Sequence, residues 1–311
     1  MKFAMVFPGQ GSQSVGMLAG YGDARPIRET LAEASDVLKQ DVGRLMAEGP
    51  AEELNSTVNT QPVMVTAGIC AWRLWRDLGG AEPSLLAGHS LGEYTALVAA
   101  GAISLADCLP LVRLRAQAMQ EAVPQGKGAM AAILGLDDEA VRAVCAEAAA
   151  GEVCEAVNFN APAQVVIAGH AAAVKRAMDG AKARGAKRAL PLPVSAPFHS
   201  SLMAPAAARL RTALSRITVN SPRIPVIHNV DARTHADAGE IRDALVSQAD
   251  HPVRWVECVK DIAARGVTHV FECGPGKVLA PLTKRITESL QGLPLCDRAG
   301  LEAALQVSKE S

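Results

Sequence analysis

The sequence has no excess of charge of either sign and no paired cysteine motif. Lys and Arg number 31 against 32 for Asp and Glu, so the net charge of −1 does not indicate a nucleic-acid partner. The seven cysteines are odd in number and never form a C-x-x-C pair, which argues against a disulfide framework or a cysteine-rich zinc site. We therefore expect a protein of a reducing cytoplasm that holds no metal.

Long apolar runs are also absent. Arg73, Arg76 and Asp77 interrupt an alanine-rich region, and no stretch reaches the roughly 18 to 20 apolar residues that span a bilayer. The N-terminal apolar run, residues 3–7, is too short for a signal peptide. These features predict a soluble protein with no membrane partner.

Short apolar runs alternate with longer segments of helical period, which is typical of a parallel sheet flanked by helices. The predicted buried strands cover residues 2–7, 85–88, 225–229 and 269–272. The predicted helices cover residues 62–78, 91–100, 105–122, 203–217 and 253–265.

A different order of elements occupies the middle of the chain. The pattern is strand, helix, strand, strand, helix, strand, which is the order of a ferredoxin-like unit. Its elements are predicted at residues 128–134, 137–149, 153–158, 164–168, 172–184 and 186–192. Proline and glycine bracket the unit, so we expect a small domain of residues 125–194 inserted into a discontinuous domain of residues 1–124 and 195–311.

The sharpest chemical motif is the G-x-S-x-G sequence centred on Ser90, which lies between a predicted strand and a predicted helix. This context is that of a nucleophile elbow, in which the Leu91 amide can stabilise an oxyanion. The alternative is a serine that only caps the helix.

A serine nucleophile requires a base, which is usually histidine. His199 is the best candidate of the seven histidines, because it lies in a loop that follows the inserted domain. His89 adjoins the serine but would point away from it, so we interpret it as structural. A surface or core role for His199 is the alternative.

Gln10 lies in the glycine-rich segment Gly9-Gln10-Gly11 after the first strand. The segment matches neither G-x-x-x-x-G-K-[ST] nor G-x-G-x-x-G, which disfavours a phosphate loop. The Gln10 amide could supply the second oxyanion donor, and a plain turn is the alternative.

Arg115 shares the apolar face of its predicted helix with Leu111, Ala118 and Met119. A buried guanidinium requires an anionic partner, and its planar fork suits a carboxylate. The partner could be a carboxylated substrate or an Asp or Glu of the chain. The further alternative is a side chain whose charged end snorkels to solvent.

These residues resemble the malonyl-CoA:acyl carrier protein transacylases of fatty-acid synthesis and the related acyltransferase domains of polyketide synthases. The resemblance covers residues 3 to 290 or so and is carried by ordered motifs, which include Gly88-His89-Ser90-Leu91-Gly92-Glu93, Thr60-Gln61-Pro62, Asn158-Phe159-Asn160, Pro197-Phe198-His199 and Glu272-Cys273-Gly274-Pro275-Gly276.

The resemblance implies an α/β fold, with an α/β-hydrolase-like large domain and the inserted ferredoxin-like small domain. It implies malonyl transfer from malonyl-CoA to acyl carrier protein without a cofactor. Separately, we expect a monomer. The implied catalytic residues are Ser90, His199 and Gln248, whose backbone carbonyl would orient the histidine from a loop. The implied oxyanion donors are Gln10 and Leu91, and the implied substrate-binding residues are Arg115, Met119, Gln61, Asn160 and Phe198.

Three alternatives stay open at this point. The G-x-S-x-G motif alone also fits a serine hydrolase or thioesterase. A transferase subunit of a malonate decarboxylase would show similar motifs, and a non-catalytic subunit that docks a carrier protein could retain the fold.

Overall fold

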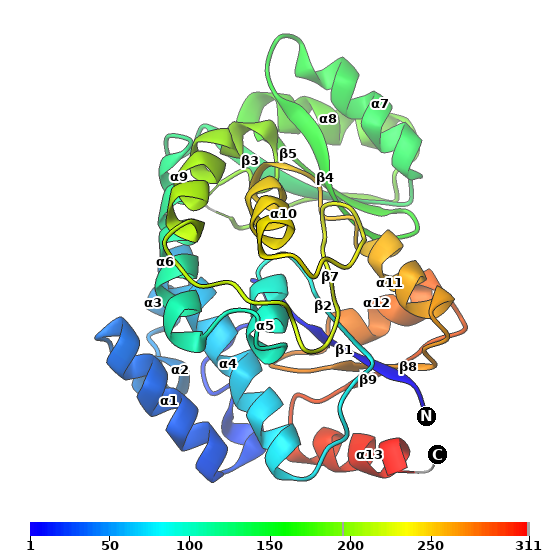
Figure 1. The fold of residues 1–311 in the computed structure, drawn as a ribbon. Helices are drawn as coiled ribbons and strands as arrows, with labels where there is room; N and C mark the ends of the chain where they lie inside the picture. Colours follow the sequence, from blue (N-terminus) through cyan, green and yellow to red (C-terminus); the bar gives the residue numbers. More distant parts are fainter. Residues whose placement is uncertain (195, 310–311) are drawn as a thin grey trace.

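A computed structural model describes residues 1–194 and 196–309, which form a larger and a smaller sheet with their helices (Figure 1). The larger sheet has five strands in the order β7-β2-β1-β8-β9, and every neighbouring pair is parallel. Its strands are β1 (Phe3–Phe7), β2 (Leu85–Gly88), β7 (Val226–Ile227), β8 (His269–Glu272) and β9 (Gln291–Pro294).

The parallel sheet is buried on both faces, as sheets covered by helices are. Along the central strand β1, Met5 and Phe7 join the larger apolar cluster, whereas Ala4 and Val6 join a second cluster on the opposite face. The helices around this sheet are α1 (Arg25–Leu38), α2 (Val42–Glu48), α3 (Ala51–Asn55), α4 (Thr57–Asp77), α5 (Gly92–Ala99), α6 (Leu105–Glu121), α9 (Ala204–Leu214), α10 (Ala238–Asp250), α11 (Trp255–Ala264), α12 (Leu279–Ile286) and α13 (Arg298–Lys309), with short 3-10 turns at Ala19–Tyr21 and Ser201–Met203.

The smaller sheet has four antiparallel strands in the order β4-β5-β3-β6, with α7 and α8 packed on one face. Its elements are β3 (Gly128–Leu134), α7 (Asp138–Ala149), β4 (Cys154–Ala161), β5 (Gln164–His170), α8 (Ala171–Ala183) and β6 (Arg188–Pro191). The predicted element order and fold class are confirmed. The exact domain boundaries stay a prediction.

Main-chain hydrogen bonds join the two parts. The amide of Phe159 in β4 donates to the carbonyl oxygen of Val253 at 3.0 Å, and the amide of Val253 donates to that of Val157 at 2.8 Å. The end of β4 is thereby fixed to the segment that precedes α11. The face of the small sheet opposite α7 and α8, which includes Met130 and Val166, packs against the segment after β6 and faces the ends of β1 and β2.

Several elements differ from the sequence-based predictions. Gln248 was expected in a loop, and this prediction is wrong, because α10 continues to Asp250. Helix α4 begins at Thr57 and contains Pro62 inside the helix, whereas the pattern placed its start at Pro62. Among the described residues, no helix combines the length and the apolar character needed to cross a membrane.

Candidate active site

Ser90 lies in the sharp turn between β2 and α5 and has a φ of 49°, a left-handed conformation that is costly for a residue other than glycine. The glycines on either side make this turn possible. A Cβ atom on Gly88 would lie 1.9 Å from the carbonyl carbon of Gly92, and one on Gly92 would lie 2.1 Å from the carbonyl oxygen of Phe7. The strand and the helix therefore approach each other as closely as the backbone allows, and Ser90 stands at the top of the turn.

Asn229, which follows β7, fixes the turn from behind. Its Oδ1 accepts a hydrogen bond from the Ser90 amide at 2.6 Å, and its Nδ2 donates to the Gly88 carbonyl oxygen at 2.8 Å. Asn229 ends the predicted strand of residues 225–229, but nothing in the local sequence indicated that its side chain reaches the elbow.

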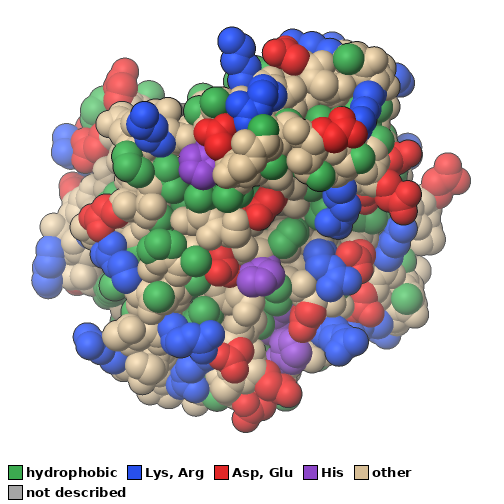
Figure 2. Space-filling view, turned by 90° about the horizontal axis from the view of Figure 1, so that it is seen from above, with side chains coloured by type: hydrophobic (Ala, Val, Ile, Leu, Met, Phe, Trp, Pro, Cys, Tyr) green, Lys and Arg blue, Asp and Glu red, His purple; other side chains and the backbone are tan. Residues whose placement is uncertain are grey.

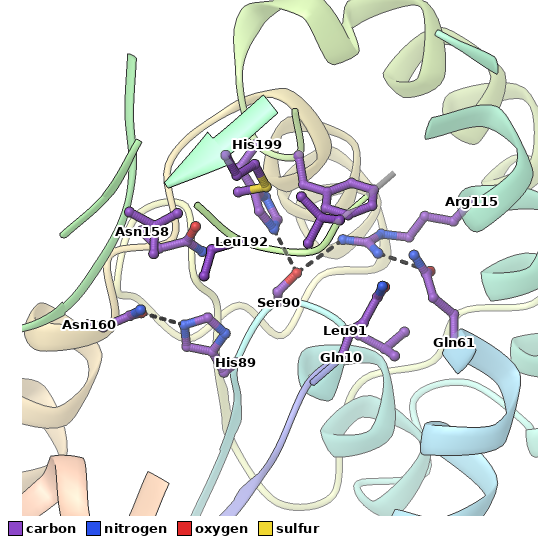
Figure 3. Close-up of a pocket in the computed structure, with 14 residues that line it drawn as sticks. Gln10, Gln61, His89, Ser90, Leu91, Arg115, Asn158, Asn160, Leu192 and His199 are labelled. Carbon is purple, nitrogen blue, oxygen red and sulfur yellow. Dashed lines mark hydrogen bonds between the residues drawn. The ribbon is translucent and has the colours of Figure 1, made fainter. Parts of the chain in front are cut away.

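His199 is the base candidate, and its Nε2 lies 2.7 Å from the Ser90 Oγ (Figure 3). Its Nδ1 lies 2.8 Å from the carbonyl oxygen of Gln248, so the orienting group is a neutral main-chain carbonyl. The histidine is only 4% exposed, and burial together with the nearby Arg115 charge lowers its pKa to about 3. The imidazole is therefore neutral at physiological pH, the state in which Nε2 can take a proton.

Arg115 reaches the same hydroxyl from α6. Its Nη2 donates to the Ser90 Oγ at 3.3 Å and to the Gln248 Oε1 at 3.0 Å, and its Nη1 donates to the Gln61 Oε1 at 3.0 Å. Its guanidinium carbon also lies 5.3 Å from the centre of the Tyr94 ring. Burial lowers the Arg115 pKa.

No Asp or Glu of the described residues forms an ion pair with Arg115. Its hydrogen-bond acceptors are two amide oxygens and one hydroxyl, all of them neutral. The alternative of an internal salt bridge is thus absent from the described part of the chain, and the positive charge is available to an anion in the cavity.

These side chains line a cavity of about 200 Å³ between the two sheets. The small sheet and the segment after it contribute an apolar side that the sequence motifs did not reveal, including Met130, Val166, Leu192 and Val194. The predicted residues that line it are Gln10, Gln61, Ser90, Leu91, Arg115, Asn160, Phe198 and His199. Met119 is fully buried in the larger apolar cluster and is not among the lining residues, so its substrate contact stays a prediction.

His89 turns away from the nucleophile, as expected. Its Nε2 lies 2.7 Å from the Asn160 Oδ1 in β4, on the side of the cavity opposite Arg115 (Figure 3). Burial lowers the pKa of His89, so this ring is a neutral link between the elbow and the small sheet.

Gln10 and Leu91 line the cavity, and their main-chain amides donate no hydrogen bond within the described part of the chain. The Gln10 side chain is directed elsewhere, because its Nε2 donates to the Thr57 Oγ1 at 3.2 Å. Two unengaged amides beside a serine hydroxyl are what an oxyanion requires. Within the same residues, no group of three or more His, Cys, Asp or Glu side chains could hold a metal ion.

The fold and the site define an acyltransferase. The family model described as "Acyl transferase domain" matches residues 4–303, and the chain belongs to this family. Two curated relatives named malonyl CoA-acyl carrier protein transacylase, from Salmonella typhimurium and Escherichia coli K12, are 56% and 54% identical to it, and each alignment covers 98% of this chain and 99% of the relative. The predicted family and malonyltransferase function are confirmed.

Solved structures agree with these relatives. An acyl-carrier-protein S-malonyltransferase from Burkholderia pseudomallei is 65% identical, with a TM-score of 0.97 over 98% of this chain and all of that one. A type II PKS acyl-carrier protein in complex with its malonyl-transacylase contains a chain 51% identical to this one, with a TM-score of 0.97 over 99% of this chain and all of that one.

Proposed function

We propose that this chain moves a malonyl group from malonyl-CoA to the phosphopantetheine thiol of acyl carrier protein through an ester on Ser90. The single observation that carries the proposal is that the Ser90 hydroxyl contacts both a histidine and an arginine. The Ser90 Oγ lies 2.7 Å from the His199 Nε2 and 3.3 Å from the Arg115 Nη2. A nucleophile, a neutral base and an unpaired cation at one hydroxyl suit an acyl donor that has a free carboxylate.

In the first half-reaction, Arg115 binds the carboxylate of malonyl-CoA and places the thioester carbon at the Ser90 Oγ. His199 takes the hydroxyl proton as the oxygen attacks, and the amides of Leu91 and Gln10 stabilise the oxyanion. The C–S bond then breaks, and the CoA sulfur leaves with the proton from His199. The carbonyl of Gln248 keeps the Nδ1 proton of the imidazole in place.

In the second half-reaction, the carrier's thiol gives its proton to His199 and attacks the ester carbon. The C–O bond breaks, Ser90 regains the proton, and malonyl-carrier leaves. These steps use only side chains and main-chain groups of the chain, so we propose that no cofactor takes part. Gln61, Asn160, Phe198 and Met119 are proposed to shape the acyl pocket.

A second cavity of about 160 Å³ shares Gln10, His89 and Asn160 with the first and extends toward Val278 in the loop before α12. We propose that the phosphopantetheine arm follows this path. The face in Figure 2 mixes Lys and Arg with Asp and Glu side chains, so it offers no patch of a single sign. A monomeric state and a cytoplasmic location stay predictions.

Intact-protein mass spectrometry after brief exposure to malonyl-CoA tests the proposal directly. We expect a gain of one malonyl group, which is lost in Ser90→Ala and retained in Ser215→Ala, a variant of an exposed serine. Addition of holo acyl carrier protein should remove the group and yield malonyl-carrier, whereas the carrier without phosphopantetheine should leave it in place.

The same experiment separates the alternatives. Release of free malonate at the rate of transfer to the carrier would identify a hydrolase and contradict the proposal. Transfer only to the carrier subunit of a malonate decarboxylase, and not to the carrier of fatty-acid synthesis, would identify a subunit of that enzyme.

A further inference from the structure

Glu93 is a buried carboxylate behind the nucleophile that none of the steps above uses. It lies in the first turn of α5, is 0% exposed, and does not line the cavity. An ionised carboxylate in such a place is costly unless several donors satisfy it. Here its Oε1 accepts from the His228 Nδ1 at 2.8 Å, and its Oε2 accepts from the Asn229 amide at 2.8 Å and the Gln248 Nε2 at 2.9 Å.

The contact between Glu93 and Gln248 determines which end of the Gln248 side-chain amide faces Arg115. The Gln248 Nε2 donates to Glu93 and to the Ser90 carbonyl oxygen, the latter also at 2.9 Å. The opposite end, Oε1, is therefore directed at the Arg115 Nη2, 3.0 Å away. An amide has one accepting and one donating end, so a rotated Gln248 would present N–H groups to the guanidinium.

The position of Arg115 depends on this orientation. Its fork is held by the amide oxygens of Gln61 and Gln248, one on each terminal nitrogen. Without Gln248, only Gln61 and the Ser90 hydroxyl would remain as hydrogen-bond partners in the described part of the chain. The negative charge of Glu93 also favours the charged form of Arg115.

We propose that Glu93 is a positioning residue, which acts through the side-chain amide of Gln248 to hold Arg115 in the orientation that selects a carboxylated acyl group. This inference rests on the proposed function. It assigns the Gln248 side chain a role separate from that of its main-chain carbonyl, and it makes selection of the acyl group depend on a residue that never touches the substrate.

Glu93→Gln tests the inference with almost no change in size. A glutamine has one oxygen in place of two, so it cannot accept from His228, Asn229 and Gln248 together. We expect the ratio of kcat/KM for malonyl-CoA to that for acetyl-CoA to fall about tenfold. A ratio does not depend on the fraction of protein that folds, so a purely structural defect would leave it unchanged.

Two further variants complete the test. Gln248→Leu removes the amide and keeps the main-chain carbonyl, and should lower the ratio to a similar extent even if Glu93→Gln does not fold. The double variant should have the same ratio as Gln248→Leu alone, because both changes break the same connection between Glu93 and Arg115. Effects that multiply in the double variant, or a wild-type ratio in either single variant, would overturn the inference.

Glu272→Gln is the matched control. Glu272 is another 0% exposed carboxylate, and its partners are the main-chain amides at the start of α12, away from Arg115. It should lower stability and leave the ratio unchanged. If the wild type forms no malonyl adduct, the proposed function fails. If the wild type transfers malonyl and Glu93→Gln keeps the wild-type ratio of the two kcat/KM values, only the present inference is refuted.

Discussion

The Nδ1 of His199 lies 2.8 Å from the main-chain carbonyl oxygen of Gln248 and not beside a carboxylate. A neutral carbonyl fixes the tautomer and the orientation of the ring but adds little stabilisation to the imidazolium. Burial and the Arg115 charge then dominate and lower the His199 pKa to about 3. The His199 imidazole should therefore stay neutral far below the ordinary range of histidine.

The pH dependence of Ser90 reactivity follows from this pKa. Labelling of Ser90 by a sulfonyl fluoride, which has no carboxylate, should proceed at a constant rate from pH 8 to about 5, since His199 gains its proton only near pH 3. In Arg115→Ala the decrease in labelling rate at acid pH should begin at a higher pH, because a positive charge that disfavours the imidazolium is gone. A decrease in the wild-type labelling rate that is centred near pH 6.5 would contradict the prediction.

The lowered pKa of His199 should also make the free energy of unfolding depend on pH. Unfolded His199 gains a proton near its ordinary pKa of 6.5, whereas folded His199 stays neutral to about 3. As the pH falls through this window, the unfolded state binds more protons, so the contribution of His199 to the free energy of unfolding decreases. Urea unfolding of the wild type and His199→Gln at several pH values measures this difference.

Arg115→Ala should change the choice of acyl group more than the overall chemistry. Removal of a bidentate partner for a buried carboxylate costs several kcal/mol, so kcat/KM for malonyl-CoA should fall about 100-fold or more. Acetyl-CoA has no carboxylate, and its kcat/KM should fall much less. Steady-state kinetics with both substrates decide the matter, and equal losses would remove the selector role.

Arg113→Ala is the control for this prediction. Arg113 lies on the same helix, but its guanidinium donates to the Leu38 carbonyl oxygen and to Gln40 on another side of α6. Its loss should leave the preference for malonyl-CoA unchanged.

Much of the site could be predicted from local sequence. The glycines around Ser90 determine the elbow within five residues, and the spacing of Arg115 with apolar neighbours correctly indicated that it is buried. Glu93 and Asn229 could not be assigned a role in this way, because their contacts join β2 and α5 to the segment after β7, which lies more than 100 residues further along the chain. Periodicity predicts that a residue is buried but not which side chain it meets.

The error at Gln248 has a specific cause. A proline disfavours a helical conformation in the residue before it, so His251-Pro252 marks where a helix can end, and α10 runs up to Asp250 directly before this pair. Its start was also recognisable, because Asp237 caps the helix by accepting from the amides of Gly239 and Glu240. The same applies to α1, which has Pro26 in its first turn and lies outside the predicted elements.

Gly92→Ala should disrupt the elbow. The added Cβ would lie 2.1 Å from the Phe7 carbonyl oxygen, which belongs to the central strand and cannot move aside easily. We expect a loss of about 3 kcal/mol or more in the free energy of unfolding, together with loss of Ser90 labelling. Gly180→Ala, inside α8 with its nearest neighbour at 3.5 Å, should instead gain about 1 kcal/mol. A folded, fully active Gly92→Ala would show that the close packing is not required.

Glu272→Ala should destabilise the protein without altering its preference for malonyl-CoA. The carboxylate accepts from the amides of Val278 and Leu279 at 2.9 Å and of Ala280 at 2.8 Å, which satisfies the first turn of α12 at the end of β8. Alanine would leave these three donors without that acceptor, and the expected cost is about 3 kcal/mol or more in urea unfolding. Glu272→Gln keeps one oxygen, so its free energy of unfolding should lie between those of the wild type and Glu272→Ala. If Glu272→Ala unfolds at the wild-type urea concentration, water replaces the carboxylate at little cost, and Glu272 does not anchor α12.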